Sequence, residues 1–225
     1  MSSLTLMRHG QASFGAASYD ALSEVGVAQA RATGAWLHER GQRWTAVLHG
    51  PRRRQADTAR HLLAAADPAA PLQLAPGLDE FAEGEEVLAA AAALFGRPMT
   101  GPEAPERAEQ LRCYEAAYQA WSRGEAAIAP RVSCAEFRLA ARTWLHEIIA
   151  PPDVPKSQRI LAVTSAGVIA AIVCEVLDLA DAQWAQLVRV IHNASLTEVV
   201  FSKGRCGLRS FNGTGHLPRQ LMSSI

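Results

Sequence analysis

Six short apolar runs recur along the chain, and segments with apolar residues at helical spacing separate most of them. Short apolar runs that are bounded by turn residues predict strands. A turn at Lys203 and Gly204 joins the last two runs. The predicted strands cover residues 4–7, 45–48, 72–74, 159–164, 196–201 and 208–211.

Helix signals lie between these runs. Ser23 has the character of an N-cap with Glu24 in the first turn, and Gly41 suits the position just after the C-terminus. Ser133 and Glu136 have the spacing of a capping box. The predicted helices cover residues 23–41, 51–66, 85–95, 106–123, 133–150 and 167–177, the second of them beginning at Pro51.

Strands that alternate with helices predict an α/β fold, a three-layer sandwich in which a mainly parallel sheet has helices on both faces. We expect a single domain over residues 1–225. Residues 96–132 carry no strand signal and are interpreted as a helical insertion. Residues 151–158, which are rich in proline, are expected to form a linker.

The charge balance and the cysteines narrow the class of protein. Lys plus Arg and Asp plus Glu both number 22, so the basic surplus of a nucleic-acid binder is missing. Four scattered cysteines without a CxxC pair predict reduced thiols and no zinc site. We therefore expect no metal, no cofactor and no nucleic-acid partner.

The longest apolar stretch, residues 160–174, is shorter than the ~20 residues that a membrane-spanning helix requires. It is also interrupted by Thr164, Ser165 and Gly167. No secretory leader is visible, because Arg8 and His9 break the first apolar run early. These features predict a cytoplasmic protein that has no membrane partner.

Polar residues follow the first four predicted strands. The first strand ends in Arg8-His9, and the second leads into residues 52–54, all arginine. Asp79-Glu80 follows the third strand and Ser165-Ala166-Gly167 follows the fourth. Because ligands of parallel sheets bind beyond the carboxyl ends of the strands, these groups are expected to meet in one site.

Arginines beside a histidine and a carboxylate suit a phosphate ester. Arginine forks match phosphate oxygens in pairs, and a neutral imidazole can attack phosphorus. A carboxyl group can protonate the leaving alkoxide and then activate water. The arginines themselves neutralise the developing charge, so the reaction needs no metal.

In order and spacing, these motifs resemble the histidine phosphatase superfamily, also called phosphoglycerate mutase-like. The resemblance covers nearly the whole chain and leaves the helical insertion unmatched. Its positions are Arg8-His9-Gly10, Leu22-Ser23, Gly26, Gln29-Ala30, Arg54, Thr58-Ala59, Leu78-Asp79-Glu80, Asn193-Ala194-Ser195 and His216-Leu217.

The resemblance implies that His9 is the nucleophile and Glu80 the general acid and base. It also implies that Arg8 and Arg54 bind the phosphate. Gln11, which follows the nucleophile, is a further candidate for phosphate binding.

Three positions depart from the family pattern. Ser165 stands where the family has a second histidine, Gln55 where alanine is usual, and His49 where serine is usual. Ser165 is expected to bind phosphate without supplying charge, which would lower the rate roughly ten- to a hundredfold. The N–H groups of Ala166 and Gly167, at a predicted helix start, would offset part of that loss.

Other polar residues near the site have plainer readings. His49 is a candidate to replace the second imidazole. Arg52 and Arg53 are read as solvated residues at a helix start. The carboxylates near Glu80 are read as solvent-exposed charges; they are Asp79, Glu83 and Glu85.

The leading hypothesis is a phosphatase that hydrolyses a small phosphate monoester through a phosphohistidine, with activity reduced by Ser165. The alternative is a phosphate-ester-binding protein with little or no turnover. A phosphoglycerate mutase proper is less favoured, because residues 11–20 lack the Trp-Asn pair and the basic segment of that enzyme. A weaker hypothesis makes the helical insertion a protein-interaction module. The sequence identifies no substrate and leaves a homodimer open.

Overall fold

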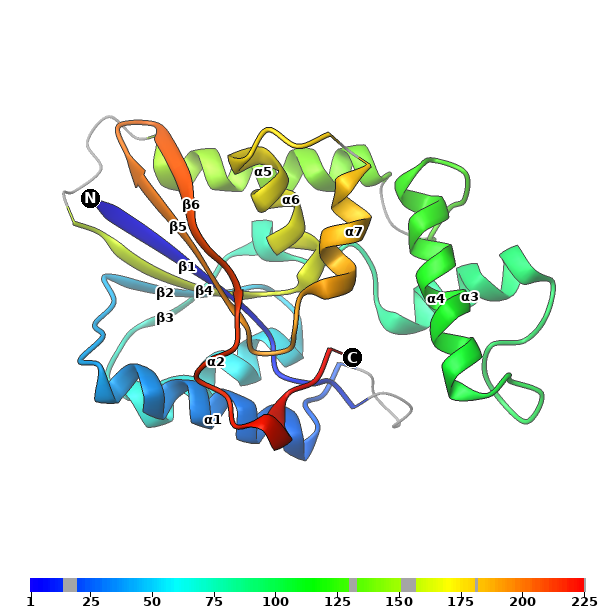
Figure 1. Ribbon diagram of the computed structural model, residues 1–225, viewed down its shortest axis with the longest axis horizontal. Coiled ribbons are helices and arrows are strands. Elements are labelled where there is room, and N and C mark those ends of the chain that lie inside the picture. Colours follow the sequence, from blue (N-terminus) through cyan, green and yellow to red (C-terminus); the bar gives the residue numbers. More distant parts are fainter. Residues whose placement is uncertain (14–19, 130–132, 151–156, 181, 225) are drawn as a thin grey trace.

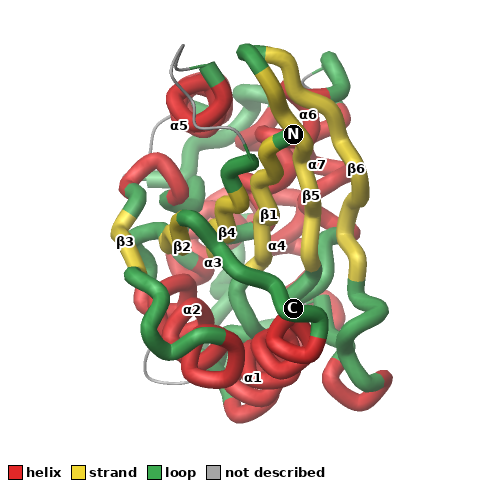
Figure 2. The backbone as a smooth tube through the Cα atoms, turned by 90° about the vertical axis from the view of Figure 1, so that its left-hand side faces the viewer, coloured by secondary structure: helices red, strands yellow, loops and turns green. Residues whose placement is uncertain are grey.

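The structure is a computed structural model that describes residues 1–13, 20–129, 133–150, 157–180 and 182–224. Its centre is one six-stranded sheet. The strands are β1 (Ser2–Arg8), β2 (Ala46–His49), β3 (Leu72–Leu74), β4 (Arg159–Thr164), β5 (Leu196–Ser202) and β6 (Arg205–Gly213). They lie in the order β3-β2-β4-β1-β5-β6, side by side in Figure 2.

The first four strands are mutually parallel, since β1 and β2 both pair in parallel with β4 and β3 pairs in parallel with β2. β5 runs antiparallel to β1, and β6 runs antiparallel to β5. The carboxyl ends of β1 to β4 therefore share one edge of the sheet. This arrangement confirms the predicted α/β fold with a mainly parallel sheet.

Helices cover both faces of the sheet (Figure 1). α1 and α2 lie on one face, and α5, α6 and α7 lie on the other. α3 and α4 project to one side of these layers. Their bounds are α1 (Glu24–Glu39), α2 (Arg53–Ala66), α3 (Gly84–Phe95), α4 (Arg107–Ser122), α5 (Cys134–Ile149), α6 (Ala166–Val176) and α7 (Gln183–Val190), with 3-10 turns at η1 (Pro76–Leu78) and η2 (Arg219–Leu221).

The central strand β4 explains why the sheet is covered on both faces. Its side chains alternate, so Ile160 and Ala162 belong to the core under α5 and α6. Leu161 and Val163 belong to the second core, which packs against α1 and α2. A strand that buries both faces reads as a continuous apolar run, which is how its position could be predicted.

Several predicted boundaries agree with the structure. The strands at 72–74 and 159–164 have the predicted bounds. Ser23 caps α1 by accepting a hydrogen bond from the Gly26 N–H at 3.1 Å, and Ser133 forms the predicted capping box with Glu136. α2 begins at Arg53 rather than at Pro51, so the predicted start was wrong by two residues. The segment 151–156 of the predicted linker lies outside the described residues.

α7 had no counterpart among the predicted helices. It is short, and its place depends on Trp184, which is fully buried in a cluster of aromatic rings. Phe81 stacks on Trp121 with ring centroids 4.9 Å apart, and Trp184 meets Phe81 edge-on at 5.4 Å. The Trp184 indole N–H also donates to the Gly167 carbonyl at 3.0 Å. The cluster ties α4 and α7 to the start of α6.

No helix within the described ranges is both long enough and apolar enough to cross a membrane.

Candidate active site

The end of β1 places His9 at the carboxyl edge of the sheet. The His9 N–H donates to the Thr164 carbonyl of β4 at 2.8 Å, which continues the parallel pairing by one residue. The Gly10 N–H then donates to Oγ1 of Thr58 on α2 at 3.0 Å. A Cβ atom at Gly10 would lie 2.4 Å from the Gly26 carbonyl oxygen, so this turn requires glycine.

The His9 side chain is 5% exposed, and its environment fixes its tautomer. Nδ1 lies 2.8 Å from the Gly10 carbonyl oxygen, which can only accept, so Nδ1 carries the proton. Nε2 therefore has a lone pair, which accepts a hydrogen bond from Nε of Arg54 at 3.3 Å.

Burial holds the pKa of His9 well below its usual range. The positive charges of Arg54 and Arg8 lower the pKa further, while the hydrogen bond to Gly10 acts in the opposite direction. The imidazole is therefore neutral at neutral pH, which is the form that can act as a nucleophile.

Arg54, on the first turn of α2, is 2% exposed and points at His9. Its Nη1 donates to Asp20 at 2.8 Å and to Glu83 at 2.7 Å. These carboxylates offset the cost of burying the guanidinium and hold its plane in place. The positive charge thus stays beside the imidazole before any ligand binds.

Arg8 reaches the same place from the last residue of β1. Its Nη1 donates to the backbone carbonyl oxygens of Ile191 and Ser224, the latter at 2.7 Å. Both acceptors are neutral and come from the C-terminal third of the chain. Arg8 therefore adds positive charge to the site.

Glu80 follows the 3-10 turn η1 and lies against the start of α6. Its carboxylate accepts hydrogen bonds from the N–H groups of Phe81 at 2.9 Å and Gly167 at 3.1 Å. Burial raises the pKa of Glu80 above its usual value, and these two hydrogen bonds oppose that rise. A Cβ atom at Gly167 would lie 2.2 Å from the carboxylate, so glycine leaves the room that Glu80 occupies.

Arg52 is not the solvated residue that was expected. It is 7% exposed, forms ion pairs with Asp79 and Glu83, and donates to the Glu80 carbonyl at 3.2 Å. The readings of Asp79 and Glu83 as solvent charges were therefore also wrong, because the loop after β3 folds back over the start of α2. Arg53, whose side chain is 67% exposed, fits its prediction.

A cavity of about 180 Å³ joins these groups. Its inner wall is formed at the sheet edge and its outer wall by α4 and α7. The inner wall comprises Arg8, His9, Arg54, Glu80, Phe81, Ala82, Ala166 and Ser224. The outer wall comprises Leu111, Arg112, Tyr114, Glu115, Tyr118, Val188 and Arg189.

The outer wall was not foreseen from the sequence. Arg189 forms an ion pair with Glu115 at 3.0 Å, and the side chain of Arg112 is exposed. Tyr114 lies beside them on α4. No motif marks these positions, and α7 itself had not been predicted. An apolar helix face with arginines is so common that it carries no signal of a ligand site.

Five of the seven candidate site residues line this cavity, and Gln11 and Ser165 are outside its described lining. Gln11 instead accepts a hydrogen bond from the Ser23 hydroxyl at 2.9 Å, at the start of α1. Ser165 is fully buried. His49 is also outside the described lining, and its Nδ1 donates to the Gly50 carbonyl oxygen at 2.7 Å. The five that line the cavity are Arg8, His9, Arg54, Glu80 and Ala166.

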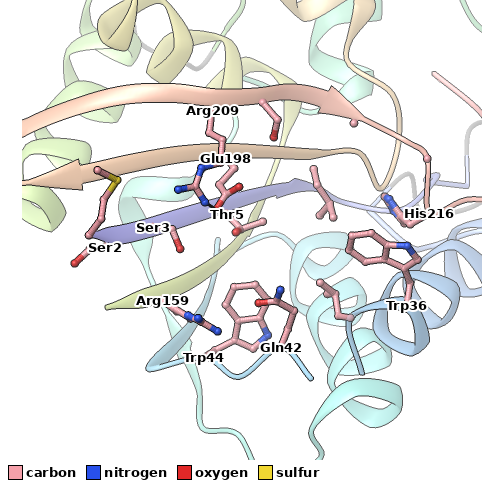
Figure 3. Close-up of a pocket in the computed structure, with 16 residues that line it drawn as sticks. Ser2, Ser3, Thr5, Trp36, Gln42, Trp44, Arg159, Glu198, Arg209 and His216 are labelled. Carbon is pink, nitrogen blue, oxygen red and sulfur yellow. Dashed lines mark hydrogen bonds and ion pairs between the residues drawn. The ribbon is translucent and has the colours of Figure 1, made fainter. Parts of the chain in front are cut away.

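A second cavity, of about 490 Å³, lies between the sheet and the C-terminal end of α1 (Figure 3). Trp36 and Trp44 form its lower side in that view, and His216 lies beside Trp36 with ring centroids 5.5 Å apart. Glu198 and Arg209 pair with each other at 3.0 Å on the strands above. The cavity thus extends from the amino ends of β1 and β4 to Leu196, and His9 is outside its described lining.

A model of the histidine phosphatase superfamily, branch 1, matches residues 4–91 and 95–214. The chain belongs to the histidine phosphatase superfamily. The second matched range includes residues 96–132, the predicted helical insertion, which carries α4. None of the curated proteins matches this member of the superfamily in sequence.

Solved structures support the same fold. A phosphoserine phosphatase from Entamoeba histolytica in complex with 3-phosphoglyceric acid has a TM-score of 0.67 at 18% identity, over 97% of this chain and all of that one. A mycobacterial glucosyl-3-phosphoglycerate phosphatase has a TM-score of 0.64 at 21% identity, over 96% and 100%. A phosphoglycerate mutase from Bacillus anthracis has a TM-score of 0.64 at 17% identity, over 96% and 94%.

Proposed function

We propose that this histidine phosphatase superfamily member is a phosphatase that hydrolyses a small phosphate monoester through a phosphohistidine on His9. One observation carries the proposal: a buried imidazole with its proton on Nδ1 holds its Nε2 lone pair 3.3 Å from the Nε atom of Arg54, at the wall of a cavity. Arg8 and Glu80 line the same cavity.

In the first step, Nε2 of His9 attacks phosphorus and the bond from phosphorus to the ester oxygen breaks. The protonated carboxyl group of Glu80 gives its proton to that oxygen, so the leaving group departs as an alcohol. The charges of Arg8 and Arg54 stabilise the phosphoryl oxygens during transfer. This step leaves phosphohistidine and the Glu80 carboxylate.

In the second step, the Glu80 carboxylate takes a proton from a water molecule that attacks the phosphohistidine. The bond from nitrogen to phosphorus breaks, phosphate departs and the lone pair returns to Nε2. Glu80 ends protonated and His9 ends neutral, as both began. The raised pKa of Glu80 supports this double role, because a carboxyl group that alternates between acid and base needs a pKa nearer the working pH.

The outer wall favours a substrate whose leaving group is small and negatively charged. The cavity volume of about 180 Å³ favours a small substrate. Arg112 and Arg189 bring two positive charges to that wall, and Glu115 offsets one of them. Structural relatives include a phosphoserine phosphatase, whose substrate has a carboxylate.

A second candidate function is phosphate-ester binding with little turnover. This candidate is supported because His9 is the only histidine in the described lining of the cavity. Ser165, at the position of the family's second histidine, is fully buried outside that lining. Such a site would have the positive charge for binding an anion but one imidazole fewer than the family pattern for the transition state.

Hydrolysis of p-nitrophenyl phosphate, phosphoserine and 3-phosphoglycerate separates the two candidates. The proposal predicts turnover by the wild type that His9→Ala removes. Vanadate that raises the melting temperature of a protein without turnover would favour the binding protein. Turnover that survives in His9→Ala would refute both readings of the site.

A further inference from the structure

The carboxamide of Gln55 connects three loops at the carboxyl edge of the sheet. Gln55 lies on the first turn of α2 and is fully buried. Its Oε1 accepts a hydrogen bond from the Arg52 N–H at 3.1 Å. Its Nε2 donates to the Leu78 carbonyl at 3.1 Å and to the Ser165 hydroxyl at 2.8 Å. Both N–H bonds of the amide are thereby used.

Each partner of Gln55 lies two residues before Arg54, before Glu80 or before the glycine that binds Glu80. Arg52 precedes the turn of α2 that carries Arg54, and Leu78 ends the 3-10 turn before Glu80. Ser165 is the N-cap residue of α6, whose Gly167 N–H binds the Glu80 carboxylate. The amide therefore fixes the three loops that hold Arg54, Glu80 and the start of α6.

The surrounding backbone is shaped around this side chain. A Cβ atom at Gly50 would lie 2.1 Å from Oε1 of Gln55 and 2.5 Å from the Leu78 carbonyl oxygen. The Thr164 hydroxyl also donates to that carbonyl, at 2.9 Å. Buried polar groups are stable only when paired, so this arrangement depends on a carboxamide at position 55.

The two departures from the family pattern at positions 55 and 165 are in contact. The family resemblance has alanine in place of Gln55 and a second histidine in place of Ser165. Here the serine hydroxyl is fully buried and accepts the amide hydrogen of Gln55.

We propose that Gln55 is a positioning residue that holds Glu80 for proton transfer, and that Ser165 is the hydrogen-bond partner of Gln55 rather than a phosphate ligand. This inference rests on the proposed function, because Glu80 needs a reaction in which to act. It replaces the expectation that Ser165 binds phosphate directly.

The test compares two substrates that differ in their need for a proton. An alkyl phosphate needs the acid at the leaving oxygen, whereas p-nitrophenol leaves well without it. Gln55→Met keeps the length of the side chain and removes its hydrogen bonds. We expect kcat/KM for the alkyl phosphate to fall about tenfold, a part of the ~10²–10⁴ that a general acid supplies. The fall for p-nitrophenyl phosphate should be under about threefold.

Gln110→Met is the matched control, because Gln110 makes a side-chain hydrogen bond to the Met99 carbonyl and is outside the described lining of the cavity. It should leave the ratio of the two kcat/KM values unchanged. If Gln55→Met is too unstable to purify, Ser165→Ala gives the same comparison, since it removes one partner of the amide. The double variant Gln55→Met/Ser165→Ala should be no worse than Gln55→Met alone.

The outcomes separate this inference from the proposed function. A wild type without turnover on either substrate refutes the proposed function and the positioning role together. If the wild type is active and Gln55→Met lowers kcat/KM for both substrates by the same factor, the positioning role alone is refuted. A double variant whose losses multiply would show that Gln55 and Ser165 act independently, which also overturns it.

Discussion

The two walls of the small cavity are built in different ways. The inner wall comes from the carboxyl ends of parallel strands, and its charged side chains are buried or half-buried and form hydrogen bonds to backbone or to carboxylates. The outer wall comes from α4 and α7, where Arg189 has a side chain that is 65% exposed and forms an ion pair with Glu115. In the proposed function, the inner wall performs the chemistry and the outer wall selects the substrate.

The largest expected effect is on the inner wall. His9→Ala removes the nucleophile, so kcat should fall by at least ~10³-fold on every substrate, as with other nucleophile deletions. Steady-state hydrolysis of p-nitrophenyl phosphate measures this loss. His49→Ala is the control, because His49 is outside the described lining of the cavity and its change should leave turnover unaltered. A comparable loss in both variants would contradict the division of roles.

Glu80→Gln should lower kcat about 10²-fold on alkyl phosphates and change the pH profile. Phosphoryl transfer needs Glu80 protonated, so activity in the wild type should fall as pH rises through its pKa, which burial raises above the usual value. Activity should also be lost at acid pH, where His9, whose pKa is lowered, takes up a proton. Loss of the alkaline limb in Glu80→Gln would support the assignment; an unchanged profile would exclude it.

A smaller effect is expected on the outer wall. Arg112→Ala and Arg189→Ala should raise KM for phosphoserine by up to about tenfold, the loss of one charge-assisted contact. The KM for p-nitrophenyl phosphate should change less, because this substrate carries no second anion. Arg123→Ala is the matched control, since Arg123 is an exposed arginine paired with Glu125. If these variants affected both substrates equally, the outer wall would have no separate role in substrate selection.

The smallest effect is expected in the cavity of Figure 3. Trp44→Phe removes an indole N–H that is buried with no hydrogen-bond partner among the described residues. Kinetic constants should stay within about twofold, because surface-cavity changes far from the reacting groups alter stability more than chemistry. Steady-state kinetics on phosphoserine measures this effect. A large change in kcat would show that the cavity of Figure 3 takes part in the reaction, which contradicts the proposed site.

The inner wall could be predicted because it follows from topology. Parallel strands bring their carboxyl ends together, so the residues after β1 to β4 had to meet, and Arg8, His9, Arg54 and Glu80 do line one cavity. The bounds of β4 were predictable because a strand that buries both faces reads as an apolar run. β1 and β6 extend beyond their predicted bounds at both ends.

Other features depend on contacts that are distant in sequence. The hydrogen bond between Gln55 and Ser165 spans 110 residues, so nothing local indicates that the serine hydroxyl is buried. Arg52 is buried only because Asp79 and Glu83 fold over it. α7 depends on Trp184, whose ring contacts come from separate segments. Local sequence patterns do not predict contacts between residues that are distant in sequence.

Trapping the intermediate tests the central claim most directly. Wild-type protein is mixed with substrate, quenched in alkali within milliseconds, digested and examined by mass spectrometry. The account predicts one phosphoryl group on the peptide that contains His9, stable in alkali, labile in acid and missing from His9→Ala. The claim would be contradicted if the active enzyme carried phosphate on another residue, or carried no phosphate at any quench time.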